Sequence, residues 1–259
     1  MLGAVIGDII GSVHEFIGTR TTEFPLFDDR CYFTDDTVLT VAVADCLLTG
    51  ASYVDKFHEY TKAYPRRAYG AGFMLWVEAG SRLPYNSWGN GSAMRVSPVG
   101  FAFDTLEETL AEAKRSAEVT HNHPEGIKGA QATAAAIFLA RQRKTKKVIR
   151  ETITKLFGYD LDRTCGEIRP SYTFNESCQG TVPEAIVAFL DSSGYEDAVR
   201  LAVSLGGDAD TLACITGGIA EAFYGGVPRE IRLEGWSRLD DRLRGVIELF
   251  YEKYKLPQP

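Results

Sequence analysis

Apolar positions recur along most of the chain at the three- and four-residue spacing of an α-helix. No segment shows the sustained alternation that is typical of a half-buried β-strand. The pattern predicts about ten helices in an all-α fold. With long connections, no long linker and no internal repeat, we expect a single compact, orthogonally packed helical domain over residues 1–259. The predicted helices cover residues 2–16, 37–48, 53–64, 73–79, 106–118, 126–143, 181–191, 195–204, 211–224 and 238–253.

The first predicted helix, over residues 2–16, has glycine at every fourth position from Gly3 to Gly11. Such a row of glycines gives a helix a smooth stripe, against which another helix can pack closely. Asp8 and Glu15 are seven residues apart, so a continuous helix would place both carboxylates on one face.

Residues 181–184, Thr-Val-Pro-Glu, read as a helix start. Thr181 can act as the N-cap, Pro183 suits the first turn, and Glu184 completes a capping box. The segment therefore predicts a helix that begins at Thr181 and ends near residue 191.

Residues 141–150 hold six basic residues and no acid. They could form a contact patch for an anionic partner. A solvated helix end followed by a loop is the interpretation we favour, because charge runs commonly serve only that purpose.

Composition narrows the protein classes. The formal net charge of −7 argues against a protein that coats nucleic acid, which needs a basic face. Five scattered cysteines form no Cys-x-x-Cys pair, and their odd number suits a reducing compartment. The apolar N-terminus lacks a basic leader and is interrupted by Asp8, and no apolar run reaches the ~20 residues of a membrane span. We expect a cytoplasmic protein without a membrane partner.

Two acidic segments match in type although about 170 residues separate them. Phe33-Thr-Asp-Asp-Thr37 and Gly207-Asp-Ala-Asp-Thr211 each place two carboxylates at the start of an apolar helix. Acids there complement the helix dipole by a few tenths of a kcal/mol each, which is the structural explanation. The repeated pairing with threonine, and the tight turn that glycines allow, favour a shared site instead.

Convergence of these segments would bring carboxylates together that repel one another unless a cation binds between them. The candidate ligands are oxygen atoms, which favours Mg²⁺ or Mn²⁺ over zinc or copper. Four or more carboxylates exceed what one Mg²⁺ usually takes from a protein, so two cations are expected. The acids that could converge are Asp8, Glu15, Asp35, Asp36, Asp208 and Asp210.

Residues 86–95 combine flexible glycines with polar side chains and Trp88. Backbone amides there could bind phosphates, and the indole could stack on a base, although an ordinary Gly/Asn-rich turn explains the segment equally well. The segment Thr120-His-Asn-His-Pro124 could contact a phosphate or cap a helix. Metal binding by its histidines ranks low, because no His-Glu-x-x-His motif accompanies them.

Six short motifs, in this order, resemble those of the ADP-ribosylglycohydrolase family. They are Gly7–Glu15, Phe33–Thr37, Tyr69–Phe73, Gly89–Arg95, Thr120–Pro124 and Gly206–Thr211. The resemblance implies a compact all-α fold of that family's type and a dinuclear Mg²⁺ or Mn²⁺ centre. It implies a metal-dependent hydrolase that releases ADP-ribose by cleaving the bond at the anomeric carbon of the distal ribose.

The resemblance also implies roles for residues. Glu15 resembles the mobile acid near the scissile bond, and the general base is Glu15, Asp35 or Asp36. The metal ligands implied are Thr34, Asp35, Asp36, Asp208, Asp210 and Thr211. The substrate contacts implied are Tyr69 and Gly70 at the distal ribose, Ser87, Trp88, Gly89, Asn90 and Gly91 at the diphosphate and adenosine, and His121.

The expected partners are an ADP-ribosylated protein or small molecule as substrate and ADP-ribose as product. Nucleic-acid-linked ADP-ribose remains among the substrates that the motifs allow. The main alternative is a module that binds ADP-ribose or a nucleotide without cleaving it. A third reading is a structural protein that reuses the fold, as some lens crystallins resembling the family do. The acceptor linkage and the preferred metal stay open.

Overall fold

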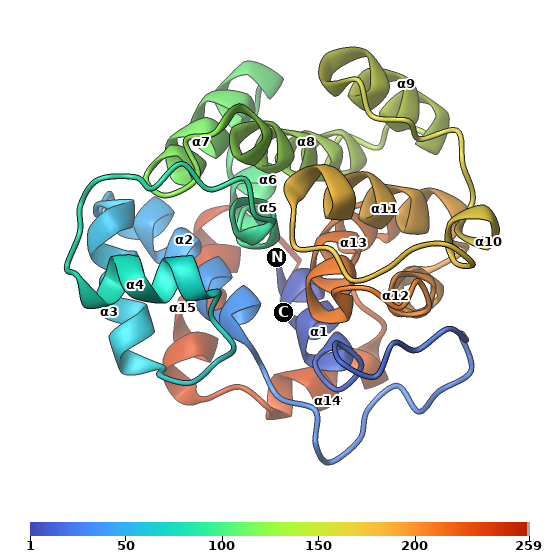
Figure 1. Cartoon of the computed structure of the whole chain (residues 1–259), viewed down its shortest axis with the longest axis horizontal. Coiled ribbons are helices and arrows are strands. Elements are labelled where there is room, and N and C mark those ends of the chain that lie inside the picture. The colour runs from blue at the N-terminus through green and yellow to red at the C-terminus, as the bar shows by residue number, and fades with distance from the viewer. Residues whose placement is uncertain (258–259) are drawn as a thin grey trace.

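The computed structural model describes residues 1–257 as helices joined by loops (Figure 1). Within that range the only strand-like pairing is an isolated bridge between Gly89 and Ser177, which confirms the all-α prediction. No helix among the described residues is long and apolar enough to span a membrane. The helices are α1 (Leu2–Gly11), α2 (Asp35–Thr49), α3 (Tyr53–Ala63), α4 (Ala71–Glu78), α5 (Gly91–Met94), α6 (Ser97–Ala102), α7 (Leu106–Glu118), α8 (Pro124–Arg141), α9 (Lys146–Phe157), α10 (Cys165–Ile168), α11 (Cys178–Asp191), α12 (Tyr195–Val203), α13 (Ala209–Tyr224), α14 (Arg229–Ser237) and α15 (Asp241–Lys253).

Helices α1 and α13 form the centre of the fold and pack against each other (Figure 1). Every residue of α1 is buried. Helices α8, α11 and α12 cover α13, while α2 contacts α1 and carries α3 and α15 on its other side. The surrounding helices run in several directions, unlike the near-parallel helices of a bundle, as orthogonal packing predicts.

Glycine makes the α1–α13 contact possible, as its spacing in the sequence predicts. A Cβ on Gly7 would lie 2.1 Å from the carbonyl oxygen of Ala213, and one on Gly3 would lie 2.5 Å from that of Gly217. Any larger residue would force the two helices apart. Because α1 carries Asp8 and α13 begins beside Asp208, this close approach also brings acidic residues of both helices together.

Several predicted helices agree closely with the structure. The helix over residues 106–118 has the predicted bounds, with Thr105 as its N-cap. Helix α2 ends where Gly50 adopts φ 74°, the left-handed conformation that terminates many helices.

The N-terminal helix is shorter than predicted, and this corrects the placement of Glu15. Helix α1 ends at Gly11, where the Ser12 hydroxyl donates to the carbonyl of Ile9 and accepts from the backbone N–H of Tyr32. Glu15 therefore lies in the turn that follows rather than on a helical face shared with Asp8.

The predicted helix start at Thr181 is wrong. Helix α11 begins one turn earlier, at Cys178, because the Ser177 side chain accepts from the Gly180 N–H and caps it. Pro183 consequently lies inside the helix. Glu184 is not part of a capping box, since its carboxylate binds the Arg163 guanidinium at 2.8 Å.

The basic run over residues 141–150 is a helix end and turn followed by another helix, α9, which the sequence prediction missed. Thr145 caps α9 at the Val148 N–H, and Lys146 donates to the carbonyls of Leu190 and Ser192. The predicted helix over 238–253 corresponds to α15, whereas α14, which precedes it, was not predicted.

Candidate active site and metal centre

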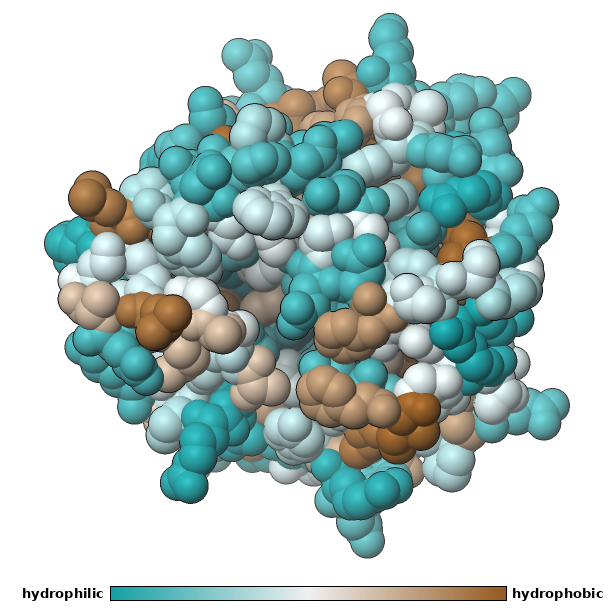
Figure 2. Space-filling view, in the orientation of Figure 1, coloured by the Kyte–Doolittle hydropathy of each residue, from teal (hydrophilic) through white to brown (hydrophobic). Residues whose placement is uncertain are grey.

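Carboxylates from three segments converge on one cleft. Asp35 and Asp36 occupy the first turn of α2, Asp208 and Asp210 lie at the start of α13, and Glu15 comes from the turn after α1. The cleft has a volume of about 330 Å³, and the face shown in Figure 2 is hollowed near its centre. Its lining includes Glu15, Asp35, Asp36, Gly70, Tyr85, Ser87, Gly89, Asn90, Gly91, Arg95, His121, Glu176, Asp208, Asp210 and Thr211.

The carboxylate oxygens form two groups that share Asp210. One group combines Asp8, Asp36 and Asp210, and the other combines Glu15, Asp208 and Asp210. Within each group one oxygen from every residue lies within 4.8 Å of the others. Two neighbouring carboxylate groups with one residue in common could hold two divalent cations.

Asp8 differs from the other acids because its oxygens already have partners. It accepts hydrogen bonds from the backbone N–H and hydroxyl of Thr34 and from the same two groups of Thr37. Burial raises the pKa of Asp8 to about 6 in spite of these bonds. The side chain thus attaches the N-terminus of α2 to α1 and fixes where Asp35 and Asp36 lie.

Burial and mutual repulsion favour protonation of the other acids. The pKa values of Asp36 and Asp210 lie well above the ordinary range, first because both side chains are buried and then because neighbouring carboxylates repel their charge. Glu15, raised by burial and then by Asp210, has a pKa of about 8. Oδ1 of Asp36 and Oε2 of Glu15 are buried without a hydrogen-bond partner among the described residues. Such an all-oxygen donor set fits hard divalent cations.

Asn90 is held within the protein rather than facing solvent. Its side-chain amide donates to Oδ2 of Asp208 at 2.7 Å and to the hydroxyl of Thr181 at 3.2 Å, and its backbone N–H donates to Glu176. Asn90 lines the cleft, where the sequence predicts a substrate contact, and its amide also holds Asp208.

The two threonines expected as metal ligands differ in their contacts. The Thr34 hydroxyl caps α2 by accepting from the Asp36 N–H and donates to Asp8 at 2.7 Å. The Thr211 hydroxyl donates to Oδ2 of Asp36 at 3.3 Å, which links α13 to α2. Both hydroxyls therefore lie beside the carboxylate cluster, as expected.

A second hollow of about 470 Å³ adjoins the acidic cleft and shares Tyr85, Ser87, Gly89 and Glu176 with it. Trp88 lines this outer part with 53% of its surface exposed. The bridge between Gly89 and Ser177 anchors the loop, so the indole is presented on a fixed backbone. Such a shelf next to an acidic cleft suits a ligand with a flat aromatic ring.

His121 is buried beside Thr120 and Arg95. The Thr120 hydroxyl accepts from the Arg95 guanidinium at 2.7 Å and lies 2.8 Å from Nδ1 of His121. In the tautomer in which Thr120 donates to Nδ1, Nε2 carries the ring hydrogen. Burial, and then the charge of Arg95, hold the pKa of His121 well below its usual range.

Tyr69 and Gly70 differ in their relation to the cleft. Gly70 lines it. The Tyr69 hydroxyl donates to the carbonyl of Tyr64, its ring stacks on Phe73, and it is not among the described residues that line the cavity.

Three polar residues of the cleft, Tyr85, Arg95 and Glu176, have no role predicted from the sequence. Tyr85 and Glu176 line the cleft, but neither belongs to a recognisable motif. Arg95 ends the Gly89–Arg95 motif and is fully buried. Its guanidinium carbon lies 4.2 Å from the centroid of the Phe57 ring. Its burial and its bond to Thr120 depend on long-range packing, which local sequence does not reveal.

Comparison with known proteins places these motifs in context. The family model for ADP-ribosylglycohydrolase matches residues 1–259. ADP-ribosylhydrolase ARH3 of Mus musculus is 26% identical, over 97% of this chain and 91% of its own. ADP-ribosylarginine hydrolase Tri1 of Pseudomonas putida (strain GB-1) is 26% identical, over 92% of this chain and 74% of its own.

A solved structure described as an ADP-ribosylglycohydrolase-related protein complex has a similar fold. It has a TM-score of 0.67 and 24% sequence identity, and the match covers 98% of this chain and 96% of that one. With the family match over residues 1–259, the conclusion is that the chain belongs to the ADP-ribosylglycohydrolase family and is a glycosidic-bond hydrolase.

Proposed function

We propose that this chain releases ADP-ribose from a modified acceptor by hydrolysing the bond at the anomeric carbon of the distal ribose, with two divalent cations, Mg²⁺ or Mn²⁺, in the acidic cleft. The observation that carries the proposal is the pair of carboxylate groups that share Asp210. The names of the relatives ARH3 and Tri1 support the substrate class.

The acids would divide into ligands and supports. Asp36, Asp208 and Asp210 supply oxygens to the two groups, with Asp35, Thr34 and Thr211 beside them. Asp8 would hold the N-terminus of α2 in place, and Asn90 would hold Asp208 in place. Bound cations would neutralise the repulsion between the acids, orient the ribose hydroxyls and lower the pKa of a bound water.

Glu15 is the carboxylate best suited to exchange a proton with the reacting groups. It enters the cleft from a turn, its Oε2 has no hydrogen-bond partner among residues 1–257, and in the cation-free cleft burial and then Asp210 raise its pKa to about 8. A general base works best when its pKa is close to the working pH. Asp35 and Asp36 remain the other candidates from the sequence.

The outer groove would hold the adenosine diphosphate part of the substrate. Trp88 offers an exposed ring for stacking, and the tautomer of His121 in which Thr120 donates to Nδ1 would offer Nε2–H to an anionic oxygen. A Cβ on Gly91 would lie 3.2 Å from that nitrogen, so glycine leaves room for the ligand beside it. Ser87 and Gly89 line both parts of the groove.

The test is a panel of arginine-, serine-, acetyl- and nucleic-acid-linked ADP-ribose, incubated with the protein and Mg²⁺ or Mn²⁺. We expect metal-dependent release of ADP-ribose from at least one linkage and its loss in Glu15→Gln. Glu248→Gln, on the distant helix α15, is the matched control and should retain activity. Tight ADP-ribose binding by calorimetry without release from any linkage would replace this proposal with the binding-module alternative.

A further inference from the structure

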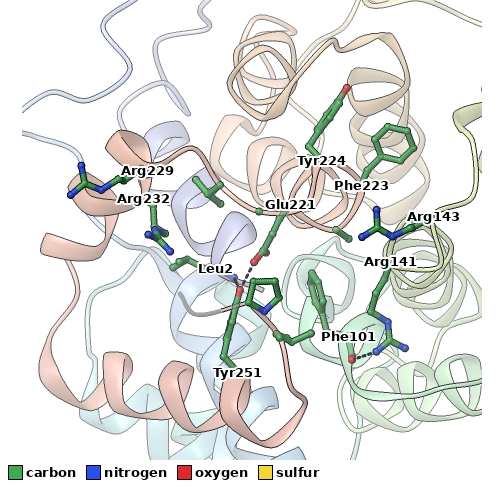
Figure 3. Close-up of a pocket in the computed structure, with 16 residues that line it drawn as sticks. Leu2, Phe101, Arg141, Arg143, Glu221, Phe223, Tyr224, Arg229, Arg232 and Tyr251 are labelled. Atoms are coloured by element: carbon green, nitrogen blue, oxygen red, sulfur yellow. Dashed lines mark hydrogen bonds between the residues drawn. The ribbon is translucent and has the colours of Figure 1, made fainter.

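A second cavity lies at the other end of α1 and α13 from the acidic cleft. Its volume is about 400 Å³, and it is bounded by the C-terminal end of α13, the start of α1, the start of α14 and the end of the chain's described part (Figure 3). A cavity of this size accommodates a small organic molecule. Since α13 rises about 1.5 Å per residue, its sixteen residues separate this cavity from Asp210.

Positive charge dominates the cavity although the whole chain carries −7. Among residues 1–257, its lining contains four arginines and one acid. Figure 3 shows Arg143 on one side, Arg229 and Arg232 on the other, and Glu221 between them. Arg141 completes the set, with its guanidinium donating to the carbonyl of Phe101 at 2.5 Å.

The single acid does not offset this charge at the cavity surface. The Glu221 carboxylate accepts hydrogen bonds from the N-terminal amine at 2.5 Å, from the Gly3 N–H at 2.8 Å and from the Tyr251 hydroxyl. The side chain is also buried. Its charge is therefore largely satisfied inside the protein.

Two of these arginines form no contact within the described part of the protein that would occupy the guanidinium group. Most arginines of this chain donate to carbonyls or carboxylates, as Arg20, Arg200 and Arg238 do. Within residues 1–257, the exposed side chains of Arg143 and Arg229 make no hydrogen bond, ion pair or ring contact. Arg143 also adopts φ 56°, a left-handed conformation that a glycine would adopt at lower cost.

The end of α14 that borders the cavity adds donors. Its N-cap is Pro228, which provides no side-chain cap, so the first N–H groups of this nine-residue helix lack the usual intramolecular acceptor. The C-terminal end of α13 carries partial negative charge, which disfavours an anion. The N–H groups of Gly225 and Gly226 both donate to the Glu221 carbonyl at this end and so satisfy one of its terminal carbonyls.

The remaining lining is apolar and aromatic. Phe101, Phe223, Tyr224 and Tyr251 contribute rings, and Leu2, Val227 and Leu256 contribute aliphatic surface. An inorganic ion would leave this surface unused. A ligand that fits has an anionic group for the guanidinium forks and an aromatic or other apolar body for the rings.

We propose that this cavity, lined by Arg143, Arg229 and Arg232, is a second ligand site that binds a small organic anion, a phosphate or carboxylate attached to an aromatic body. It is separate from the ADP-ribose cleft and does not depend on the proposed reaction. Phosphates and carboxylates both fit arginine, so the probes below distinguish them.

The test is calorimetric titration of the full chain at low salt with phenyl phosphate, benzoate, phenol and inorganic phosphate. Phenyl phosphate or benzoate should bind at least about tenfold more tightly than phenol and inorganic phosphate. The double variant Arg143→Ser/Arg229→Ser should weaken that binding by about tenfold or more. The control Arg66→Ser/Lys147→Ser removes the same charge from exposed positions outside the cavity and should bind like the parent.

Amide chemical shifts then locate the probe. Titration should move resonances of residues 222–232 and leave residues 87–91 of the cleft unchanged. Binding that survives the double variant, equal affinity for phenol, absence of binding by either aryl anion, or shifts confined to the cleft would each overturn the proposal.

Discussion

Helices α1 and α13 carry opposite electrostatic environments at their two ends. At one end, Asp36, Asp208 and Asp210 lie buried together with raised pKa values, and Oδ1 of Asp36 has no hydrogen-bond partner among the described residues. At the other end, the acid Glu221 has three hydrogen-bond donors and the surrounding charge is positive. A buried carboxylate at this end of the two helices is therefore stabilised by hydrogen-bond donors from the protein itself. Within residues 1–257, the acidic cleft supplies donors to Asp8 and Asp208 but none to Oδ1 of Asp36 or Oε2 of Glu15, which favours the proposed cations at those oxygens.

Asp210→Asn should break the acidic end with the largest effect. Loss of a residue that only supports a metal ligand lowers activity by about 10- to 100-fold. Because Asp210 belongs to both carboxylate groups, we expect its loss to lower activity by more than that. The same change removes a repulsive charge, so the cation-free protein should unfold at a higher temperature near pH 8. Kinetic assay and thermal unfolding measure the two effects. Asp241→Asn, fully exposed on α15, is the control and should change neither. Lower cation-free stability in Asp210→Asn would indicate a purely structural role.

Gly7→Ala should separate the two helices that connect the ends. Its Cβ would meet backbone of Ala213 at 2.1 Å, and overpacking of this kind costs about 3 kcal/mol of unfolding free energy. Gly245→Ala is a matched change in α15, where nothing lies within 4 Å of the added Cβ. It should stabilise the protein by about 0.5–1 kcal/mol. Equal effects of the two substitutions in denaturant unfolding would argue against close α1–α13 packing.

Asn90→Ala tests whether Asp208 needs its orienting donor. Loss of the 2.7 Å hydrogen bond should weaken cation affinity by about 10- to 100-fold, as removal of outer-sphere partners commonly does. Calorimetric titration with Mn²⁺ measures this. Asn122→Ala, whose side chain accepts from the Asn86 N–H outside the carboxylate cluster, should leave Mn²⁺ affinity unchanged. An unaltered affinity in Asn90→Ala would return Asn90 to the role of a substrate contact.

Stability should depend on pH in a direction that cations reverse. Burial and repulsion raise the pKa of Glu15 to about 8 from an ordinary value of 4.5. Burial raises the pKa values of Asp8 and Asp208 to about 6 from an ordinary value of 3.8. Between about pH 4 and 8 the folded, cation-free protein binds more protons than the unfolded chain, so these groups make it less stable as pH rises. Mg²⁺ should therefore raise the unfolding temperature more at pH 8 than at pH 5.5, by mass action on deprotonated ligands. An equal Mg²⁺ shift at both pH values would contradict the raised pKa values.

Local sequence predicted what depends on neighbours along the chain. The helix over 106–118, the stop at Gly50 and the glycine stripe of α1 follow from caps and spacing. The two acidic segments at helix starts also predicted the cluster, because one shared cation site accounts for the acids of both segments.

The errors and omissions arise from longer-range contacts. Glu15 lies outside α1 because the Ser12 hydroxyl forms hydrogen bonds with Ile9 and Tyr32 where that helix ends. Helix α11 begins before Thr181 because Ser177 caps it. The basic cavity could not be predicted, since Arg143 and Arg229 come together only when α8 and α14 are placed by the core.

The most direct test counts the cations in the cleft. The protein is equilibrated with Mn²⁺, bound Mn²⁺ is measured by elemental analysis, and coupling is measured by electron paramagnetic resonance. The account predicts two spin-coupled Mn²⁺ ions per chain in the parent, and loss of the coupled signal in Asp210→Asn because that residue is common to both carboxylate groups. Absence of tightly bound Mn²⁺, or a coupled pair that survives in Asp210→Asn, would contradict it.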